Sequence, residues 1–311
     1  MLKQAIYAQL IILIVTLIWF AFSKRRSFID SALKIFCITS LLAGLWLGGV
    51  WFYPPLYGLL IFTCLFAVLM VLHFKQSAFK SGTLRSLISN TPILALLPLS
   101  SFLIWHGVTG RLNPSGDFVD LQSPFQEGAG ACVLSGGISP LLNFHIFPSD
   151  SPQDLAQTYA LDIVKTRKNG FRTKRGYTLN PKPNVLENYE IFGTDITSPC
   201  SGLVVEYENG LPDQPIGGSD KINTGGNGVV LKCDNLHIHL HHMKKGSLSV
   251  RLGDKVVTGQ HLGQVGNSGN TIEPHLHLHA ETIVQDGNTN AHGKPIHMRF
   301  KGKYMARGAC F

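Results

Sequence analysis

Four long apolar stretches in the first 110 residues exclude a purely water-soluble fold for this 311-residue chain. Each runs for roughly 17–19 residues, about 26–28 Å as an α-helix, which is close to the ~30 Å hydrocarbon core of a bilayer. None shows the polar stripe of a helix that packs on a soluble core. We therefore predict four transmembrane helices, at Ala5–Phe22, Ile35–Tyr53, Leu56–Leu72 and Pro92–Val108.

Basic residues predict the orientation of these helices. The loop after the first stretch holds Lys24–Arg26, and the loop after the third holds Lys75, Lys80 and Arg85, whereas the second loop holds none. The positive-inside rule places both basic loops in the cytoplasm. The N-terminus and everything after residue 110 are then expected outside the cytoplasmic membrane, on its periplasmic or extracellular side.

The charge balance divides in the same place. Residues 1–110 hold eight Lys/Arg and one Asp, so they carry +7 of the formal net charge of +8. The remaining half is close to neutral, which argues against a nucleic-acid-binding domain. Lys34 and His106 are the intramembrane candidates for function, and both lie near predicted helix ends, where they can extend to the surface. We interpret the four helices as an anchor or docking unit that contacts membrane lipid.

The second half has the pattern of a β domain. Residues 111–127 are polar with Pro and Gly, which predicts a connector, and short β-type runs separated by glycines follow. Short strands at this spacing are typical of an all-β sandwich or open barrel, largely antiparallel. We assign this domain to residues 128–311. Strands are expected at 202–207, 228–233, 236–243, 248–251 and 275–280, and a weak helical pattern covers Gln153–Lys165.

Cysteine usage supports an oxidising compartment. Four of the six cysteines lie in the second half, and an even number in such a compartment indicates disulfides. Of the three pairings, we favour Cys200–Cys233 on neighbouring predicted strands, with Cys132–Cys310 joining the domain ends. A thiol zinc site is the rival interpretation, but the chain has no Cys-x-x-Cys pair.

Two histidine clusters are the strongest chemical signal. Seven of the thirteen histidines lie in Leu236–Met243 and in the run from His275 to His279. On a strand, side chains two residues apart face the same way, so His275 and His277 can converge on one point. A hydrolytic zinc site has three protein ligands and an open position for water. The pattern therefore indicates a zinc site, and we expect its third, harder ligand to be an Asp from elsewhere in the chain.

A series of linked motifs accompanies the histidines, at Ser198–Val205, His242–Met243, Leu252–Val256, Gly259–Gly263, Val265–Asn270 and Pro274–His277. In their order and spacing, and over about residues 120–300, they resemble the lysostaphin-type zinc metallopeptidases. This resemblance implies a peptidoglycan endopeptidase that cleaves peptide stems or cross-bridges, with Zn2+ as cofactor.

The resemblance also implies residue roles. His277 is the third zinc ligand, and His242 and His275 are catalytic histidines. The usual His-x-x-x-Asp pair is absent, so the first two ligands are assigned to His145, the sole His between residues 107 and 236, and to Asp162, separated by sixteen residues. A long loop between ligands costs little closure entropy, about 0.6 kcal/mol per doubling of its length.

Alternatives remain open for individual residues. Asp195 has the usual family spacing, but Ile191 stands where the His belongs. His241 could replace His242, because neighbouring strand residues face opposite sides. We interpret His237, His239 and His279 as surface residues or as partners behind the ligands.

Two other classes of protein compete with the enzyme. A non-catalytic relative would use the same fold to bind and regulate another cell-wall hydrolase, and its mark would be lost metal ligands. A cupin-like barrel also carries a His-x-His site with a Glu nearby, and Glu281 lies four residues beyond His277, but the Pro-His-Leu-His context of residues 274–277 fits such a barrel poorly. A regulatory membrane partner is not identified by these residues.

Overall fold

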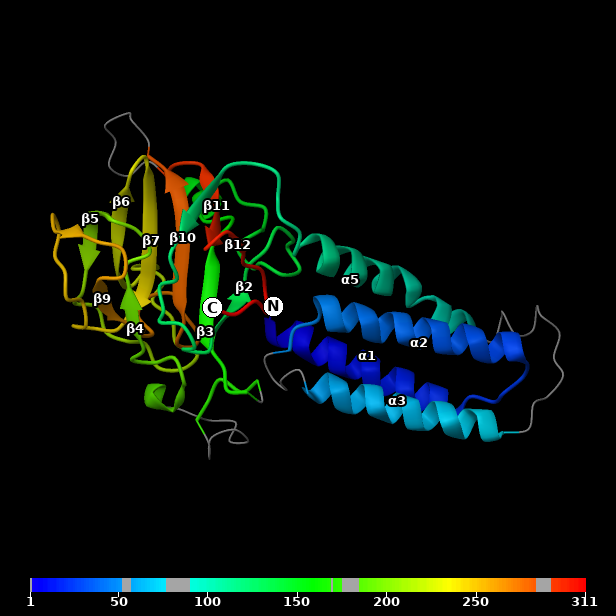
Figure 1. The fold of residues 1–311 in the computed structure, drawn as a ribbon. Coiled ribbons are helices and arrows are strands. Elements are labelled where there is room, and N and C mark those ends of the chain that lie inside the picture. The colour runs from blue at the N-terminus through cyan, green and yellow to red at the C-terminus, as the bar shows by residue number, and fades with distance from the viewer. Residues whose placement is uncertain (1, 52–56, 77–89, 169, 175–184, 284–291) are drawn as a thin grey trace. The chain divides into compact units, whose positions relative to one another are not determined.

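A computed structural model describes residues 2–51, 57–76, 90–168, 170–174, 185–283 and 292–311. The chain divides into two compact units, Met1–Thr109 and Gly110–Phe311. The first unit is helical and the second is mostly β-sheet (Figure 1). The predicted loop at residues 53–56, and Lys80 and Arg85, lie outside the described residues.

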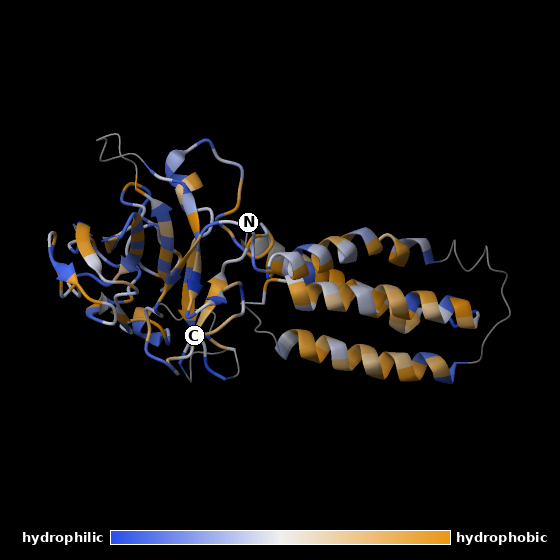
Figure 2. Cartoon of the chain, turned by 45° about the horizontal axis from the view of Figure 1, so that its top comes forward, coloured by the Kyte–Doolittle hydropathy of each residue, from blue (hydrophilic) through white to orange (hydrophobic). Residues whose placement is uncertain are grey.

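The helical unit contains apolar helices at all four predicted places. They are α1 (Leu2–Phe22), α2 (Phe28–Gly48), α3 (Tyr57–Lys75) and α5 (Leu97–Thr109), and hydrophobic residues dominate them (Figure 2). Among the described residues, three helices are long and apolar enough to cross a membrane: Phe28–Gly48, Tyr57–Lys75 and Asn90–Thr109. Ile6–Phe22 is a shorter apolar helix. Length and composition therefore support three of the four predicted transmembrane helices, and the first remains a prediction.

A turn at residues 95–96 interrupts the last of these helices. Pro98 accounts for it, because a proline lacks an N–H and its ring clashes with the carbonyl four residues earlier, here that of Leu94. Two glycines allow α2 and α5 to approach closely. A Cβ on Gly44 would lie 3.0 Å from the Cβ of Leu103, and one on Gly107 would lie 2.6 Å from the Cβ of Leu47.

Hydrogen bonds join the two predicted basic loops at one end of the helical unit. The Arg25 guanidinium donates to the Phe74 carbonyl at 3.0 Å. At the other end, the Val50 N–H donates to Gln9 Oε1 at 2.9 Å. The ends of α1, α2 and α3 therefore alternate, as the predicted topology requires.

Lys34 is buried in an ion pair. The sequence predicted that its side chain extends to the surface, and this prediction is wrong. Its Nζ lies 2.8 Å from Asp30 Oδ2, and the two side chains are 3% and 0% exposed. Asn90 Nδ2 donates to the other Asp30 oxygen at 3.0 Å. The reason is that α2 begins at Phe28 rather than Ile35, which places both charges one helical turn apart inside the unit.

Replacing Lys34 by methionine is expected to lower the free energy of unfolding by about 3 kcal/mol, because it leaves the buried Asp30 carboxylate unpaired. Adding Asp30→Asn removes the second charge and should restore most of the loss. Tryptophan fluorescence during denaturant unfolding in detergent micelles measures this unit selectively, since all four tryptophans lie in residues 1–109. An unchanged midpoint for Lys34→Met would contradict the pairing.

The second unit contains a ten-stranded sheet with β10 near its centre (Figure 1). Its path is β1-β11-β10-β7-β6-β5-β8, with β3 also on β10, β2 on β3 and β12 on β11, and β4 and β9 form a separate pair. All pairings are antiparallel except that of β1 with β11. The elements are β1 (Phe118–Leu121), β2 (Ala131–Ser135), α6 (Pro152–Ala156), β3 (Leu161–Lys165), η1 (Leu186–Asn188), β4 (Asp195–Thr197), β5 (Gly202–Glu208), β6 (Asn227–Cys233), β7 (Leu236–Met243), β8 (Lys255–Val256), β9 (His261–Gln264), β10 (Leu276–Thr282), β11 (Pro295–Phe300) and β12 (Lys303–Tyr304).

Alternation along β7 and β10 separates a core face from a polar face. Ile238, Leu240, Leu276 and Leu278 are fully buried in the hydrophobic core, and the histidines between them point to the other face. Both favoured disulfides, Cys132–Cys310 and Cys200–Cys233, are present.

Three local expectations differ from the structure. Residues 248–251 form no strand, and the helical pattern at 153–165 divides into α6 and β3. The segment expected to be a connector contains β1, which pairs with β11. These are short or edge segments, for which long-range pairing outweighs local pattern.

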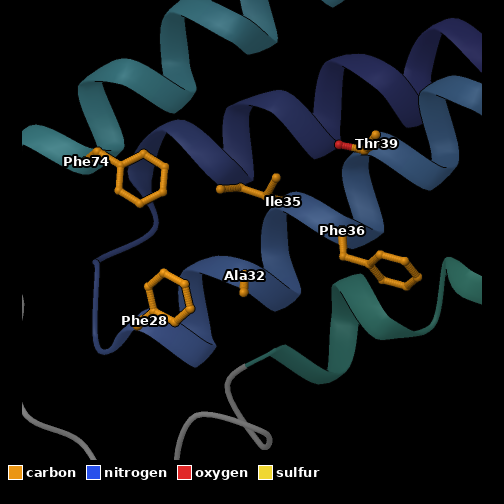
Figure 3. Close-up of a pocket in the computed structure, with 6 residues that line it drawn as sticks. All are labelled: Phe28, Ala32, Ile35, Phe36, Thr39 and Phe74. Atoms are coloured by element: carbon orange, nitrogen blue, oxygen red, sulfur yellow. The ribbon is translucent and has the colours of Figure 1, made fainter.

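The helical unit also has an apolar hollow of about 440 Å³ (Figure 3). Phe28 and Phe36 are largely exposed there, and the only polar side-chain atom shown is a threonine oxygen. This lining holds no acid, base or metal-ligating group. Its lining residues are Phe28, Ala32, Ile35, Phe36, Thr39 and Phe74.

Candidate metal centre

Strand pairing around β10 places an aspartate beside the second histidine of the His-x-His motif. In the register of the sheet, His277 lies opposite Asp162 on β3 and opposite His241 on β7. Directly opposed residues project to the same face of a sheet, with Cβ atoms about 5 Å apart. The pairing of β3 with β10 therefore brings together two residues that are 115 positions apart in the chain.

His145 completes a three-residue cluster at this point. Its Nε2 lies 3.1 Å from both Asp162 oxygens, and His277 Nδ1 lies 3.1 Å from Asp162 Oδ1. One donor atom from each of the three residues lies within 4.8 Å of the others. The structure thus brings together the three residues to which the sequence analysis assigns the metal.

Asn143 holds the loop that carries His145. Its side-chain amide donates to the carbonyls of Thr158 and Ala160 at 3.1 and 3.3 Å, and its Oδ1 accepts from the His145 N–H at 3.0 Å. The loop is thereby attached to the chain just before β3, at Ala160, two residues before Asp162. Asn143 is fully buried. Its role was not predicted, and the available signal was its place two residues before the sole histidine between residues 107 and 236.

Electrostatics prepare these groups to bind a cation. Burial alone would raise the pKa of Asp162, but the charges of His145 and His275 and hydrogen bonds from His145 and His277 hold that pKa well below its usual range. Burial lowers the pKa of His277 to about 4, despite its hydrogen bond to Asp162. Asp162 is therefore an anion and His277 a neutral imidazole near pH 7, as metal ligands need to be. Burial alone would lower the pKa of His145, but the charge and hydrogen bond of Asp162 outweigh it and raise that pKa, so a bound cation would displace a proton from this ring.

The donor set fits zinc. Two imidazole nitrogens and one carboxylate oxygen are common zinc ligands, and ligand atoms at 2.0–2.1 Å in a tetrahedron lie about 3.3 Å apart. The distances of 3.1 Å from His145 and His277 to Asp162 are close to that value. With three protein ligands, one coordination position is left for water or substrate.

The other ring nitrogen of His277 also has a partner. His277 Nε2 lies 3.1 Å from His279 Nδ1. Partners of this kind orient a ligating imidazole and select its tautomer. His279 is only 6% exposed, so it is not a surface residue. Its position agrees with the alternative, that it is a partner behind the ligand His277.

His275 and His242 lie next to the cluster. His275 Nε2 is 3.6 Å from Asp162 Oδ1, and the His242 ring is 4.7 Å from the His275 ring. His242 Nδ1 lies 2.8 Å from the Ser268 carbonyl, and His275 Nδ1 lies 2.9 Å from the Glu273 carbonyl. Because a carbonyl only accepts, both rings carry a proton on Nδ1 and have Nε2 free for chemistry.

A left-handed backbone explains how His242 reaches this place. Its φ of 62° departs from the extended conformation of β7, and its N–H donates to the Gly225 carbonyl at 3.0 Å. Burial, together with the neighbouring histidines, holds the pKa of His242 well below its usual value. The ring of the alternative residue, His241, lies 6.1 Å from the His277 ring.

Asp195, the rival ligand, lies apart from the cluster. Its side chain is 61% exposed on β4 and lies 3.4 Å from His261 Nε2. Gln264 Nε2 also donates to Asp195 Oδ1 at 3.1 Å. Asp195 therefore pairs with residues of β9.

An antiparallel sheet with a His-Asp-His cluster and two more histidines beside it has the arrangement of a metal-dependent hydrolase. Residues 188–297 match the model of peptidase family M23. Over this segment the second unit is therefore similar to that family. The matched segment includes His242, His275 and His277, whereas His145 and Asp162 precede it.

Parts of the chain are also similar to individual proteins and solved structures. Glycyl-glycine endopeptidase ALE-1 of Staphylococcus capitis is 27% identical over 117 residues, which are 37% of this chain and 31% of the relative. The chain thus spans about a third of the length of the curated relative that it matches. The catalytic domain of lysostaphin from Staphylococcus simulans is 27% identical with a TM-score of 0.24, covering 29% of this chain and 60% of that one. A zinc-containing peptidase from Vibrio cholerae is 14% identical with a TM-score of 0.31, covering 57% and 39%.

Proposed function

We propose that this protein is a membrane-anchored zinc metalloendopeptidase that hydrolyses peptide bonds in peptidoglycan stems or cross-links. The observation that carries the proposal is the meeting of His145, Asp162 and His277 through the pairing of β3 with β10. The family match and the relative described as a glycyl-glycine endopeptidase support the substrate class.

His145 Nε2, an Asp162 oxygen and His277 Nδ1 would hold the zinc. When bound, zinc acts as a Lewis acid that polarises the scissile carbonyl and lowers the pKa of water to about 7. His275 presents a free Nε2 beside Asp162 and accepts the proton of the attacking water. Once His275 has gained this proton, its Nε2–H donates to the developing oxyanion and stabilises it. His242, whose ring is next to that of His275, shares in passing the proton on to the amine that leaves.

We further propose that four helices span the cytoplasmic membrane, with the peptidase domain on its outer side. Three helices of sufficient length, the shorter apolar helix at 6–22, and basic loops at one end of the helical unit support this topology. The two disulfides of the second unit also suit an oxidising compartment. The proposed substrate, peptidoglycan, also lies outside the cytoplasmic membrane.

The test is to purify the full chain in detergent, measure bound zinc, and incubate it with purified sacculi. We expect new free amino groups on wall peptides, identified by labelling and mass spectrometry, and their loss after chelation. Bound zinc with no hydrolysis of any wall peptide would overturn the enzyme proposal and favour a non-catalytic regulator of another hydrolase.

A further inference from the structure

A second group of potential ligands lies on the polar face of β7 and β10. His237 and His239 alternate along β7, and His279 and Glu281 alternate along β10. In the register, His239 lies opposite His279 and His237 opposite Glu281, so all four project to the same face. The proposed peptidase mechanism uses none of them as a metal ligand or for proton transfer.

Three of these side chains converge. One donor atom each from His237, His239 and Glu281 lies within 4.8 Å of the other two. His239 Nε2 is already 2.9 Å from Glu281 Oε1. A tetrahedral zinc ion needs separations of about 3.3 Å, so side-chain rotation alone can bring the wider pairs into place.

The carboxylate of Glu281 is held in position from its other side. Its Oε2 accepts from the Gly293 N–H at 2.9 Å and lies 3.5 Å from His292 Nδ1. Glu281 is only 2% exposed and His239 only 5%, whereas His237 is half-buried. A buried, anchored carboxylate with two imidazoles, open to solvent on the side of His237, is arranged as a ligand set with free coordination positions.

The group is separate from the first centre but adjoins it through one residue. His279 stacks on His239 with ring centroids 4.1 Å apart, and its Nδ1 lies 3.1 Å from His277 Nε2. The two ligand sets share no residue. We propose that His237, His239 and Glu281 form a second metal site, which binds a divalent transition-metal ion of the zinc class.

The experiment titrates the metal-free full chain in detergent with Zn2+ and, separately, with Co2+, whose visible absorption reports coordination. We expect two equivalents per chain. Asp162→Asn should remove one of them, His237→Ala should remove the other, and the two changes together should remove both. This stoichiometry does not depend on hydrolysis, so failure of the proposed peptidase activity would leave it unaffected.

Two further variants make the result decisive. Glu281→Gln keeps the size of the side chain and an acceptor for Gly293, and it should weaken the second equivalent by at least tenfold while the first remains and shows that the domain is folded. His261→Ala is the matched control, because His261 also lies beside a carboxylate, that of Asp195, but on the exposed surface; it should retain both equivalents. One equivalent in the wild-type chain, or two tight equivalents in Glu281→Gln, would overturn the second site.

Discussion

Replacement of Asp162 by asparagine is expected to have two effects at once. It should abolish hydrolysis of sacculi, and it should release the zinc held by His145, Asp162 and His277. The carboxylate contacts both His145 and His277 at 3.1 Å, and an amide supplies neither its charge nor its affinity for zinc. Loss of a partner that merely supports a ligand costs about 10–100-fold in metal affinity, so loss of this ligand should exceed 100-fold. Zinc competition against a chromophoric chelator and labelling of new amino groups measure the two effects on one sample.

Asp195→Asn is the matched control for this prediction. Asp195 is the rival ligand by sequence spacing, but it is exposed and pairs with residues of β9. Zinc affinity and hydrolysis should both remain at the wild-type level in this variant. The reverse result, with activity lost in Asp195→Asn and kept in Asp162→Asn, would refute the assigned ligand set.

Replacement of His275 by alanine is expected to separate chemistry from metal binding. We expect zinc at the first centre to stay bound while kcat falls by about 10²- to 10⁴-fold, the range that a positioned acid or base contributes. The physical reason is that His275 has a free Nε2 next to Asp162 and supplies proton transfer rather than coordination. His242→Ala should behave in the same way, since its Nδ1 is likewise occupied by a carbonyl.

Zinc content and kcat must be measured in the same preparations of these variants. His261→Ala again serves as the control, because it removes an exposed imidazole from the same domain and should change neither quantity. Release of zinc from His275→Ala would show that this residue is a ligand and would contradict its role in proton transfer.

The chain lacks the family's usual His-x-x-x-Asp spacing, but the fold still brings the first two proposed ligands together. The interval from His145 to Asp162 contains α6 and a connecting turn, and Asn143 ties both ends together through hydrogen bonds to residues 145, 158 and 160. His145 and Asp162 therefore meet in the cluster although the sequence lacks the His-x-x-x-Asp motif. Sequence patterns that rely on fixed spacing cannot detect such a loop, because the ligands are placed by the sheet and not by their separation along the chain.

Second-unit strands with long alternation were predictable, and a short alternating segment was not. Residues 236–243 and 276–282 alternate between apolar and polar residues, mostly histidines, and both form strands close to the expected bounds. Residues 248–251 also alternate, but only over four residues, and they form no strand. The left-handed conformation of His242 was also beyond prediction, because strict alternation would turn His241 and His242 to opposite faces.

Hydropathy and periodicity along the sequence alone determined the apolar helices, the β character of the second half and the two histidine clusters, because these properties depend on neighbouring residues. Only the tertiary structure decided that Asp162, rather than Asp195, lies beside His277, and that Lys34 is paired with Asp30 inside the helical unit. It also decided that His237, His239 and Glu281 converge. The reason is that strand register brings residues from distant positions in the chain to one face of the sheet. The start of α2 at Phe28 places Asp30 and Lys34 one helical turn apart.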